Sequence, residues 1–228
     1  MNDLKVISSW SGGKDSCLAC HKAIKLGYQV KYLLNFISKE YKRCCFHGIE
    51  AKLLGLQAEA IGIPLVQKEV DSDMQAYEKE FKEAVEELKS KGIKGMVFGD
   101  VYLEEHEQWV QRVCKDLGIQ PINPLWDRPP DTIVKEFTDL GFKAIIVSAK
   151  ADLFGKEFLG KPIDEAFLEE LKQKNICPCG ENGEFHTFVI DGPIFKRKIK
   201  ITKSQPILKQ GFWKHWVLDI KEFALDSQ

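Results

Sequence analysis

A glycine-rich turn between a strand and a helix constrains this chain more than any other feature. The apolar run Lys5–Ser9 predicts a buried strand, and a helical pattern begins only a few residues later, near Asp15. The segment from Ser11 to Ser16 reads Ser-Gly-Gly-Lys-Asp-Ser. Glycines let the backbone approach a ligand closely, and the first amides of a helix have no partner within the helix. Such a turn is typical of a phosphate-binding site.

The spacing of this turn excludes the Walker P-loop. That motif places a glycine five residues before its Gly-Lys pair and a serine or threonine directly after the lysine. Ser8 and Asp15 occupy those positions here. The turn instead resembles the pyrophosphate-binding loop of the N-type ATP pyrophosphatases, which cleave ATP to AMP and pyrophosphate. The resemblance implies ATP as the ligand, with Lys14 and the serine hydroxyls near its phosphates.

Composition limits the classes of protein to which the chain can belong. Its 228 residues suit one or two domains, and 44% of them are hydrophobic, as in a soluble globular protein. No run approaches the roughly 18 apolar residues of a membrane span, so we expect no membrane contact. Seven cysteines without a secretory signal pattern indicate a reducing, cytoplasmic location. A net charge of -1 argues against a nucleic-acid partner held by a general basic surface.

Strands and helices alternate along the first half, which predicts an α/β fold with a doubly wound parallel sheet. The expected strands are 5–9, 30–36, 64–70 and 93–98. The expected helices are 15–26, 49–61, a long helix capped by Ser72, and one with Trp109, Val113 and Leu117 on its inner face.

Proline density marks a boundary at residues 121–130. Beyond it, we expect helices at 131–140 and 162–174, a strand at 143–149, and antiparallel strands at 186–190, 197–202 and 213–220. We therefore expect a nucleotide-binding domain over residues 1–124. A second, smaller α+β domain is expected over residues 125–228.

Gly99 and Asp100 follow another strand of the predicted sheet. Ligands of parallel sheets bind beyond the carboxyl ends of the strands, so this pair is expected beside the glycine turn. The negative charge of Asp15 would repel bound phosphates unless a cation lies between them. Mg²⁺ is the hard cation expected there. Asp100 is a second candidate metal ligand, or an ammonium contact. The alternatives are an ordinary helix-start acid and an ordinary turn acid.

A second motif begins at Gly180 and reads Gly-Glu-Asn-Gly-Glu-Phe-His-Thr-Phe-Val-Ile-Asp-Gly-Pro. Its ionisable residues, Glu181, Glu184, His186 and Asp191, are more numerous than a simple hairpin needs. Glu184 and His186 stand two apart at the start of a predicted strand, so both should project to one face. The alternative interpretation is an ordinary hairpin without a functional site.

Together, the glycine turn, the Gly-Asp pair and this second motif resemble the diphthine–ammonia ligase family over essentially the whole chain. The resemblance implies that the carboxyl group of diphthine, on the translocating elongation factor, becomes an amide. Ammonium would supply the nitrogen, and ATP would yield AMP and pyrophosphate through an adenylated carboxylate. The first domain would bind ATP, and the second would present the acceptor.

The candidate site residues follow from the motifs and from this resemblance. The expected catalytic residues are Lys14, Asp15, Asp100, Glu184 and His186. The expected ATP-binding residues are Ser9, Ser11, Gly12, Gly13, Lys14, Asp15, Ser16, Phe36, Gly99 and His47, which falls where the family has a Phe-His pair. The expected acceptor-binding residues are Glu181, Gly183, Glu184, His186, Thr187, Asp191 and Gly192. His106, at an acidic helix start, is interpreted as a solvated histidine.

Two other functions stay open at this level. A transfer-RNA modifying enzyme of the thiolation type shares the loop, but it should need reactive cysteines and a larger basic surface. A nucleotide-binding regulator without turnover is the other alternative. Two cysteine pairs, Cys17 with Cys20 and Cys177 with Cys179, allow a metal cluster, although core packing is favoured. The basic run 196–200 allows an acidic protein or an RNA as partner, although a solvated sheet face is the favoured interpretation. A homodimer is also left open.

Overall fold

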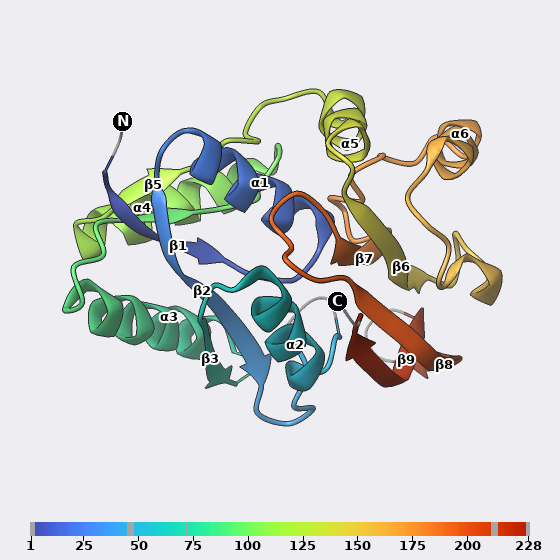
Figure 1. The fold of residues 1–228 in the computed structure, drawn as a ribbon, viewed down its shortest axis with the longest axis horizontal. Helices are drawn as coiled ribbons and strands as arrows, with labels where there is room; N and C mark the ends of the chain where they lie inside the picture. The colour runs from blue at the N-terminus through green and yellow to red at the C-terminus, as the bar shows by residue number, and fades with distance from the viewer. Residues whose placement is uncertain (1–2, 45–47, 72, 211–213, 227–228) are drawn as a thin grey trace.

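The computed structural model describes residues 3–44, 48–71, 73–210 and 214–226. Five parallel strands form the first sheet, in the order β3-β2-β1-β4-β5. Strands β1, β2, β3 and β5 are labelled in Figure 1. The strands are β1 (Lys5–Ser9), β2 (Gln29–Ser38), β3 (Leu65–Val70), β4 (Gly95–Val97) and β5 (Gln120–Ile122). The helices between them are α1 (Lys14–Lys25), α2 (Ala51–Ile61), α3 (Met74–Lys89) and α4 (Glu104–Leu117). The doubly wound α/β fold is confirmed.

The order of the strands reverses beside β1, because β2 and β4 lie on its two sides. Successive residues of a strand point to opposite faces. Val6 of β1 belongs to a hydrophobic cluster with α1 and α2, whereas Ile7 belongs to a second cluster with α3 and α4. Helices therefore cover both faces of the sheet. Ligands of such sheets bind in the crevice where the strand order reverses, and the loops after β1 and β4 both open there.

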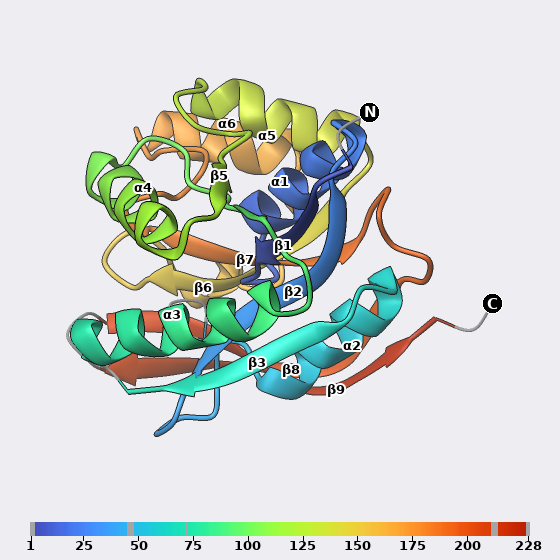
Figure 2. The same ribbon diagram turned by 90° about the vertical axis from the view of Figure 1, so that its left-hand side faces the viewer.

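The second sheet is antiparallel, with the strand order β7-β6-β9-β8. Its strands are β6 (Lys143–Lys150), β7 (Phe185–Asp191), β8 (Ile199–Gln210) and β9 (Lys214–Leu225). The helical segments of this part are α5 (Pro130–Asp139), a short 3₁₀ helix (Lys156–Phe158) and α6 (Glu165–Gln173). The α+β character expected for the second half is confirmed, and the β8–β9 hairpin lies beside α2 (Figure 2).

One hydrophobic cluster joins the two sheets. It contains Leu18 of α1 and Leu54 of α2 together with Ile146 of β6 and Phe188 of β7. The two halves of the chain thus bury apolar surface against each other, which is the main favourable term in folding. The division into residues 1–124 and 125–228 stays a prediction.

Strand β5 lies within the proline-rich segment that the sequence predicts to be a boundary. Pro121 pairs with Met96 of β4 along the edge of the first sheet. Proline has no N–H group to give to a ladder, so within sheets it is confined mainly to edge strands. The proline that signals a break is therefore compatible with one more strand, and the parallel sheet extends to residue 122.

The start of α3 also differs from the expectation. Asp73 caps this helix, and its carboxylate accepts a hydrogen bond of 2.8 Å from the backbone N–H of Ala76. Ser72, the expected cap, lies outside the described residues. Within the described ranges, no helix combines the length and the apolar character that a membrane crossing requires.

Candidate nucleotide and acceptor site

The glycine turn joins β1 to α1 in a conformation that only glycine adopts easily. Gly12 has a φ of 77°, in the left-handed region. A Cβ atom at Gly12 would lie 2.5 Å from Cδ2 of Leu54 and 2.8 Å from Oε1 of Gln57. Both the backbone angle and the close approach of α2 therefore require glycine at this position.

Two serine hydroxyls gather at the start of α1. The Ser11 hydroxyl lies 3.2 Å from that of Ser16 and accepts a hydrogen bond of 3.3 Å from the backbone N–H of Gly13. The Ser16 hydroxyl donates to the carbonyl oxygen of Gly13 at 3.0 Å. Ser9 ends β1 directly before this group. Hydroxyls and helix-start amides together form the kind of group that binds phosphate oxygens.

Lys14 is buried, and its ammonium group is already held by the protein. The Nζ atom lies 2.8 Å from Oδ2 of Asp15 and donates a hydrogen bond to the carbonyl oxygen of Cys179. Burial opposes the charge, but Asp15 and the other acidic groups nearby outweigh it and hold the pKa of Lys14 above its ordinary value. Lys14 therefore stays charged and links the loop to the segment that precedes β7. An ammonium group has three donors, so it can also bind a phosphate oxygen.

Strand β7 lies directly against the glycine turn (Figure 1). The backbone N–H of Lys14 donates a hydrogen bond of 3.0 Å to the Thr187 hydroxyl. The backbone N–H of Val189 donates to the carbonyl oxygen of Gly12 at 2.9 Å. The sequence interpretation gave the loop and the second motif to separate domains with separate tasks, and the structure brings them into contact.

The pair Gly99 and Asp100 lies where the sequence predicts it, beside the start of α1. A Cβ atom at Gly99 would lie 2.9 Å from the backbone carbon of Asp15, so the two loops touch. The Asp100 carboxylate lies 3.0 Å from Nδ1 of His106. This hydrogen bond raises the pKa of His106. His106 is exposed, as the sequence predicts, and this hydrogen bond is a contact that the sequence does not predict.

Acidic side chains converge around Lys14. Burial, followed by the nearby charge of Asp15, raises the pKa of Glu181 to about 7, and Asp100 adds to this effect. The Oδ1 atom of Asp15 is buried and has no hydrogen-bond partner among the described residues. An unpaired carboxylate oxygen beside further carboxylates fits a cation.

The cation site expected from the sequence is consistent with this chemistry. Carboxylate oxygens suit Mg²⁺, which usually takes one or two carboxylates plus substrate phosphates and waters. Within the described part of the chain, no group of three or more histidine, cysteine or acidic side chains is arranged to hold a metal ion. A cation between Asp15 and Asp100 would therefore need phosphate or water ligands.

Glu184 differs from the expectation that it projects from a strand. It precedes β7, which begins at Phe185, and its carboxylate turns back to the preceding loop. The two carboxylate oxygens accept hydrogen bonds from the backbone N–H and the side-chain amide of Asn182, at 3.0 and 3.1 Å. The Asn182 amide also lies 3.3 Å from the hydroxyl of Tyr102, which follows Asp100 in the neighbouring loop. Glu184 thus stabilises the turn that carries Glu181.

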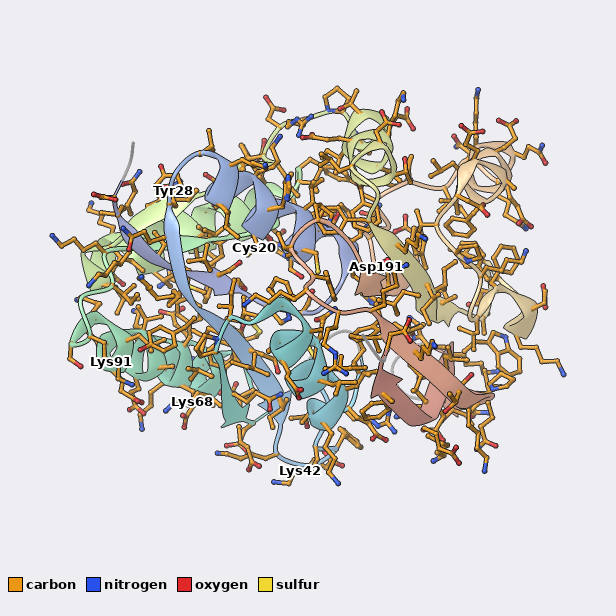
Figure 3. The ribbon with its side chains drawn as sticks, viewed as in Figure 1. Cys20, Tyr28, Lys42, Lys68, Lys91 and Asp191 are labelled. Carbon is orange, nitrogen blue, oxygen red and sulfur yellow. The ribbon has the colours of Figure 1, made fainter. Side chains whose placement is uncertain are left out.

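The remaining acceptor residues lie along the same segment. Gly183 has a φ of 74° within the turn. His186 is half-buried on β7, opposite Ser148 of β6. Asp191 ends β7, and its carboxylate accepts a hydrogen bond of 2.9 Å from the backbone N–H of Gly192 (Figure 3). Their contacts with a substrate stay predictions.

One expected nucleotide contact, Phe36, is not brought to the loop. The Phe36 ring packs in the core, 5.7 Å from the ring of Phe81 and 5.1 Å from that of Tyr77, on the side of α3 and α4. A nucleotide contact of Phe36 stays a prediction that this packing does not support. His47 lies outside the described residues.

Three of the four paired cysteines, Cys17, Cys20 and Cys179, are buried, whereas Cys177 is half-buried. Cys17 and Cys20 lie on α1 and are completely buried; Cys20 is labelled in Figure 3. Burial raises the pKa of Cys20 to about 12 and that of Cys179 higher still. Reactive thiols need a lowered pKa, so these positions favour the packing interpretation.

The basic run at residues 196–200 does not form one strand face. Strand β8 begins at Ile199, so Lys198 precedes it. Lys198 lies 3.4 Å from Asp191, and Lys200 lies 2.6 Å from Asp226. These ion pairs lower the positive charge that an RNA backbone would meet.

Gln57 is a site residue that the sequence interpretation missed. It lies on the buried face of α2, and its amide donates to the carbonyl oxygens of Gly12 and Val189. The sequence did contain a signal for this residue, because a glutamine at an inward-facing helix position must find hydrogen-bond partners in the core.

The fold and the site define a class of protein. A doubly wound sheet with a glycine loop at the point of strand reversal, next to a helix start, is an arrangement for binding phosphorylated nucleotides. Two family descriptions match the chain in succession. The diphthamide synthase N-terminal domain matches residues 4–121, and the diphthamide synthase C-terminal domain matches residues 129–224. The chain belongs to the diphthamide synthase family.

Curated relatives cover nearly the same length. The chain is 31% identical to the diphthine–ammonia ligase of Bos taurus and 29% identical to that of Homo sapiens; each match covers 90% of this chain and 85% of the relative. The diphthine–ammonia ligase of Schizosaccharomyces pombe is 26% identical, over 90% of this chain and 37% of that protein. A solved structure described as a predicted subunit of tRNA methyltransferase from Methanocaldococcus jannaschii has a TM-score of 0.46 and 20% identity, covering 83% of this chain and 98% of that chain.

Proposed function

We propose that this protein is an ATP-dependent carboxylate–ammonia ligase that amidates diphthine. Its substrates are ATP, ammonia and a protein that carries diphthine, which we take to be the translocating elongation factor. Membership of the diphthamide synthase family and the relatives named diphthine–ammonia ligase support this activity. The observation that carries the proposal is the contact between the glycine loop and β7, because it places a phosphate-binding device next to the second motif.

The chemistry requires activation of the acceptor before nitrogen can enter. A carboxylate is a poor electrophile, so its oxygen attacks the α-phosphorus of ATP, the bond to the β-phosphate breaks, and pyrophosphate leaves. Ammonia then attacks the acyl carbon of the adenylated carboxylate, loses a proton and displaces AMP. The loop contributes the Gly13 amide, the Ser11 and Ser16 hydroxyls and the charge of Lys14 where pyrophosphate accumulates negative charge.

We propose Asp15 and Asp100 as the protein ligands of Mg²⁺. The unpartnered buried oxygen of Asp15 supports this assignment. The cation, when bound, neutralises phosphate charge and orients the leaving group. The carboxyl groups of Asp100 and Glu181 also give an acidic environment that suits an ammonium ion. The hydrogen bond from His106 holds the Asp100 carboxylate in place.

The acceptor is proposed to meet the segment from Glu181 to Gly192. Its turn is ordered by Glu184, and its strand is fixed to the loop through Thr187 and Val189. The reacting carboxyl oxygen must lie about 3–3.5 Å from the α-phosphorus, and a segment fixed to the phosphate loop suits that task. The transfer-RNA alternative is not favoured, because Cys17, Cys20 and Cys179 are buried and burial raises the pKa of each thiol.

One experiment tests the proposal directly. The protein is incubated with ATP, Mg²⁺, ammonium and an elongation factor that carries diphthine, and the spent nucleotide is separated by chromatography. We expect AMP and pyrophosphate, together with the mass change that replacement of a hydroxyl by an amino group gives on the acceptor. ADP as the main product would contradict the assignment. A cytoplasmic location and a homodimer stay predictions from the sequence.

A further inference from the structure

Gln57 is a completely buried amide whose hydrogen bonds all go to the neighbourhood of the glycine loop. Its Oε1 atom accepts a hydrogen bond of 2.9 Å from the indole N–H of Trp10, the residue before Ser11. Its Nε2 atom donates to the carbonyl oxygen of Gly12 at 3.0 Å and to that of Val189 at 2.7 Å. The side chain therefore joins α2, the loop and β7 through one planar group.

The carbonyl oxygen of Gly12 is held from two sides. It accepts hydrogen bonds from the Gln57 amide and from the backbone N–H of Val189, which lies 2.9 Å away. A trans peptide group is planar, so its carbonyl oxygen and the next N–H point in opposite directions. Fixing the Gly12 oxygen toward Gln57 and β7 therefore directs the Gly13 N–H to the other side. The Ser11 hydroxyl lies on that side, 3.3 Å from the Gly13 nitrogen.

Without the hydrogen bonds to the Gly12 oxygen, the Gly12–Gly13 peptide group could rotate easily. Gly12 has a positive φ and no side chain, and glycine has the widest choice of backbone angles. A Cβ atom at Gly12 would lie 2.5 Å from Cδ2 of Leu54, so no bulkier residue fits there and no side chain of residue 12 can restrain the peptide. The hydrogen bonds from Gln57 and Val189 to the Gly12 oxygen provide that restraint instead, with the Cys17 thiol as a third, longer contact at 4.0 Å.

We propose that Gln57 is a positioning residue that orients the Gly12–Gly13 peptide for nucleotide phosphate and ties this orientation to the position of β7. It acts through the Gly12 carbonyl group and touches no reacting atom. The inference rests on the proposed function of the loop. Loss of Gln57 therefore weakens the binding of nucleotide phosphates, because the backbone N–H of Gly13 is no longer held in the direction of the phosphate.

The test uses the full-length chain and α,β-methylene ATP with Mg²⁺, because this analogue keeps the triphosphate but is not cleaved between the α- and β-phosphates. Calorimetry measures its Kd for the wild type, Gln57→Leu and Gln57→Glu. We expect the Kd to rise about tenfold in both variants at neutral pH, the size of one lost hydrogen bond to a charged group. Leu53→Ala, a buried truncation on the same helix, controls for general loss of stability and should leave the Kd unchanged.

The Gln57→Glu variant separates positioning from mere packing. It keeps the acceptor for Trp10 and the shape of the side chain, but its second oxygen would face the carbonyl oxygens of Gly12 and Val189. Protonation restores one donor, so its Kd should recover relative to the wild type as the pH falls, whereas that of Gln57→Leu should not.

Two outcomes overturn the inference in different ways. If the wild type binds no α,β-methylene ATP, the proposed function of the loop fails and the inference fails with it. If the wild type binds and a folded Gln57→Glu variant binds equally well at every pH, the inference alone fails. An increase of the Kd by Leu53→Ala as large as that of Gln57→Leu would also overturn it.

Discussion

The backbone N–H of Lys14 donates a hydrogen bond of 3.0 Å to the hydroxyl of Thr187, a residue 173 positions further along the chain. This amide belongs to the first helical residue of α1, which cannot find a partner within the helix. A side chain from the second sheet therefore completes the helix start. The glycine turn and the start of α1 are thus held by residues from both halves of the chain.

Replacement of Thr187 should reveal this contact as a loss of stability. In Thr187→Val, the buried Lys14 amide loses its acceptor, and we expect the free energy of unfolding to fall by about 1–3 kcal/mol. Thr187→Ser retains the hydroxyl and should recover most of the loss. Urea denaturation followed by circular dichroism measures both. Equal stability of the valine variant and the wild type would show that the contact contributes nothing.

Lys14→Ala should lower the rate of pyrophosphate release. By analogy with removal of one oxyanion donor, we expect a loss on the order of 100–1000-fold in kcat. A control at an exposed lysine, Lys79→Ala, should leave the rate unchanged. A thermal melt must show that the Lys14 variant is folded, because the substitution also removes the partner of Asp15. A folded variant with an unchanged rate would remove Lys14 from the catalytic residues.

Glu184→Ala should abolish amidation while ATP still binds. The carboxylate holds Asn182 and hence the turn that carries Glu181, whereas we propose that the nucleotide affinity comes mainly from the loop after β1. Calorimetry with α,β-methylene ATP and a single-turnover amidation assay on the same variant compare the two functions. Glu184→Gln keeps one acceptor oxygen and should retain part of the activity. Parallel loss of binding and amidation would mean that this segment closes over the nucleotide itself.

Glu181 should make the folded state less stable as the pH rises. Its pKa is raised from 4.5 to about 7, first by burial and then by the charge of Asp15. Between these two values the folded protein binds more protons than the unfolded chain, so the free energy of unfolding falls with increasing pH. Glu181→Gln should remove this contribution. Urea titrations at several pH values measure the difference between the two proteins, and a difference that does not vary with pH would contradict the raised pKa.

Much of the fold follows from local patterns in the sequence. The strand, glycine turn and helix around Gly12 depend on backbone geometry within a few residues, so composition and spacing predict them. The same holds for Gly62, which adopts the left-handed conformation at the end of α2. Strand β5 escapes prediction because Pro121 breaks the local pattern, and only the neighbouring strand shows that this edge tolerates proline.

The sequence by itself determined the chemistry of the loop and the class of sheet that presents it. Glycine angles, helix-start amides and hydrophobic periodicity act over short distances along the chain. Only the tertiary structure decided which distant groups complete the site. Gln57 reaches Gly12 and Val189, and Phe36 turns to the opposite core, because these choices depend on how helices and sheets pack together. Hydrogen bonds between residues far apart in sequence follow from that packing, and no local pattern encodes them.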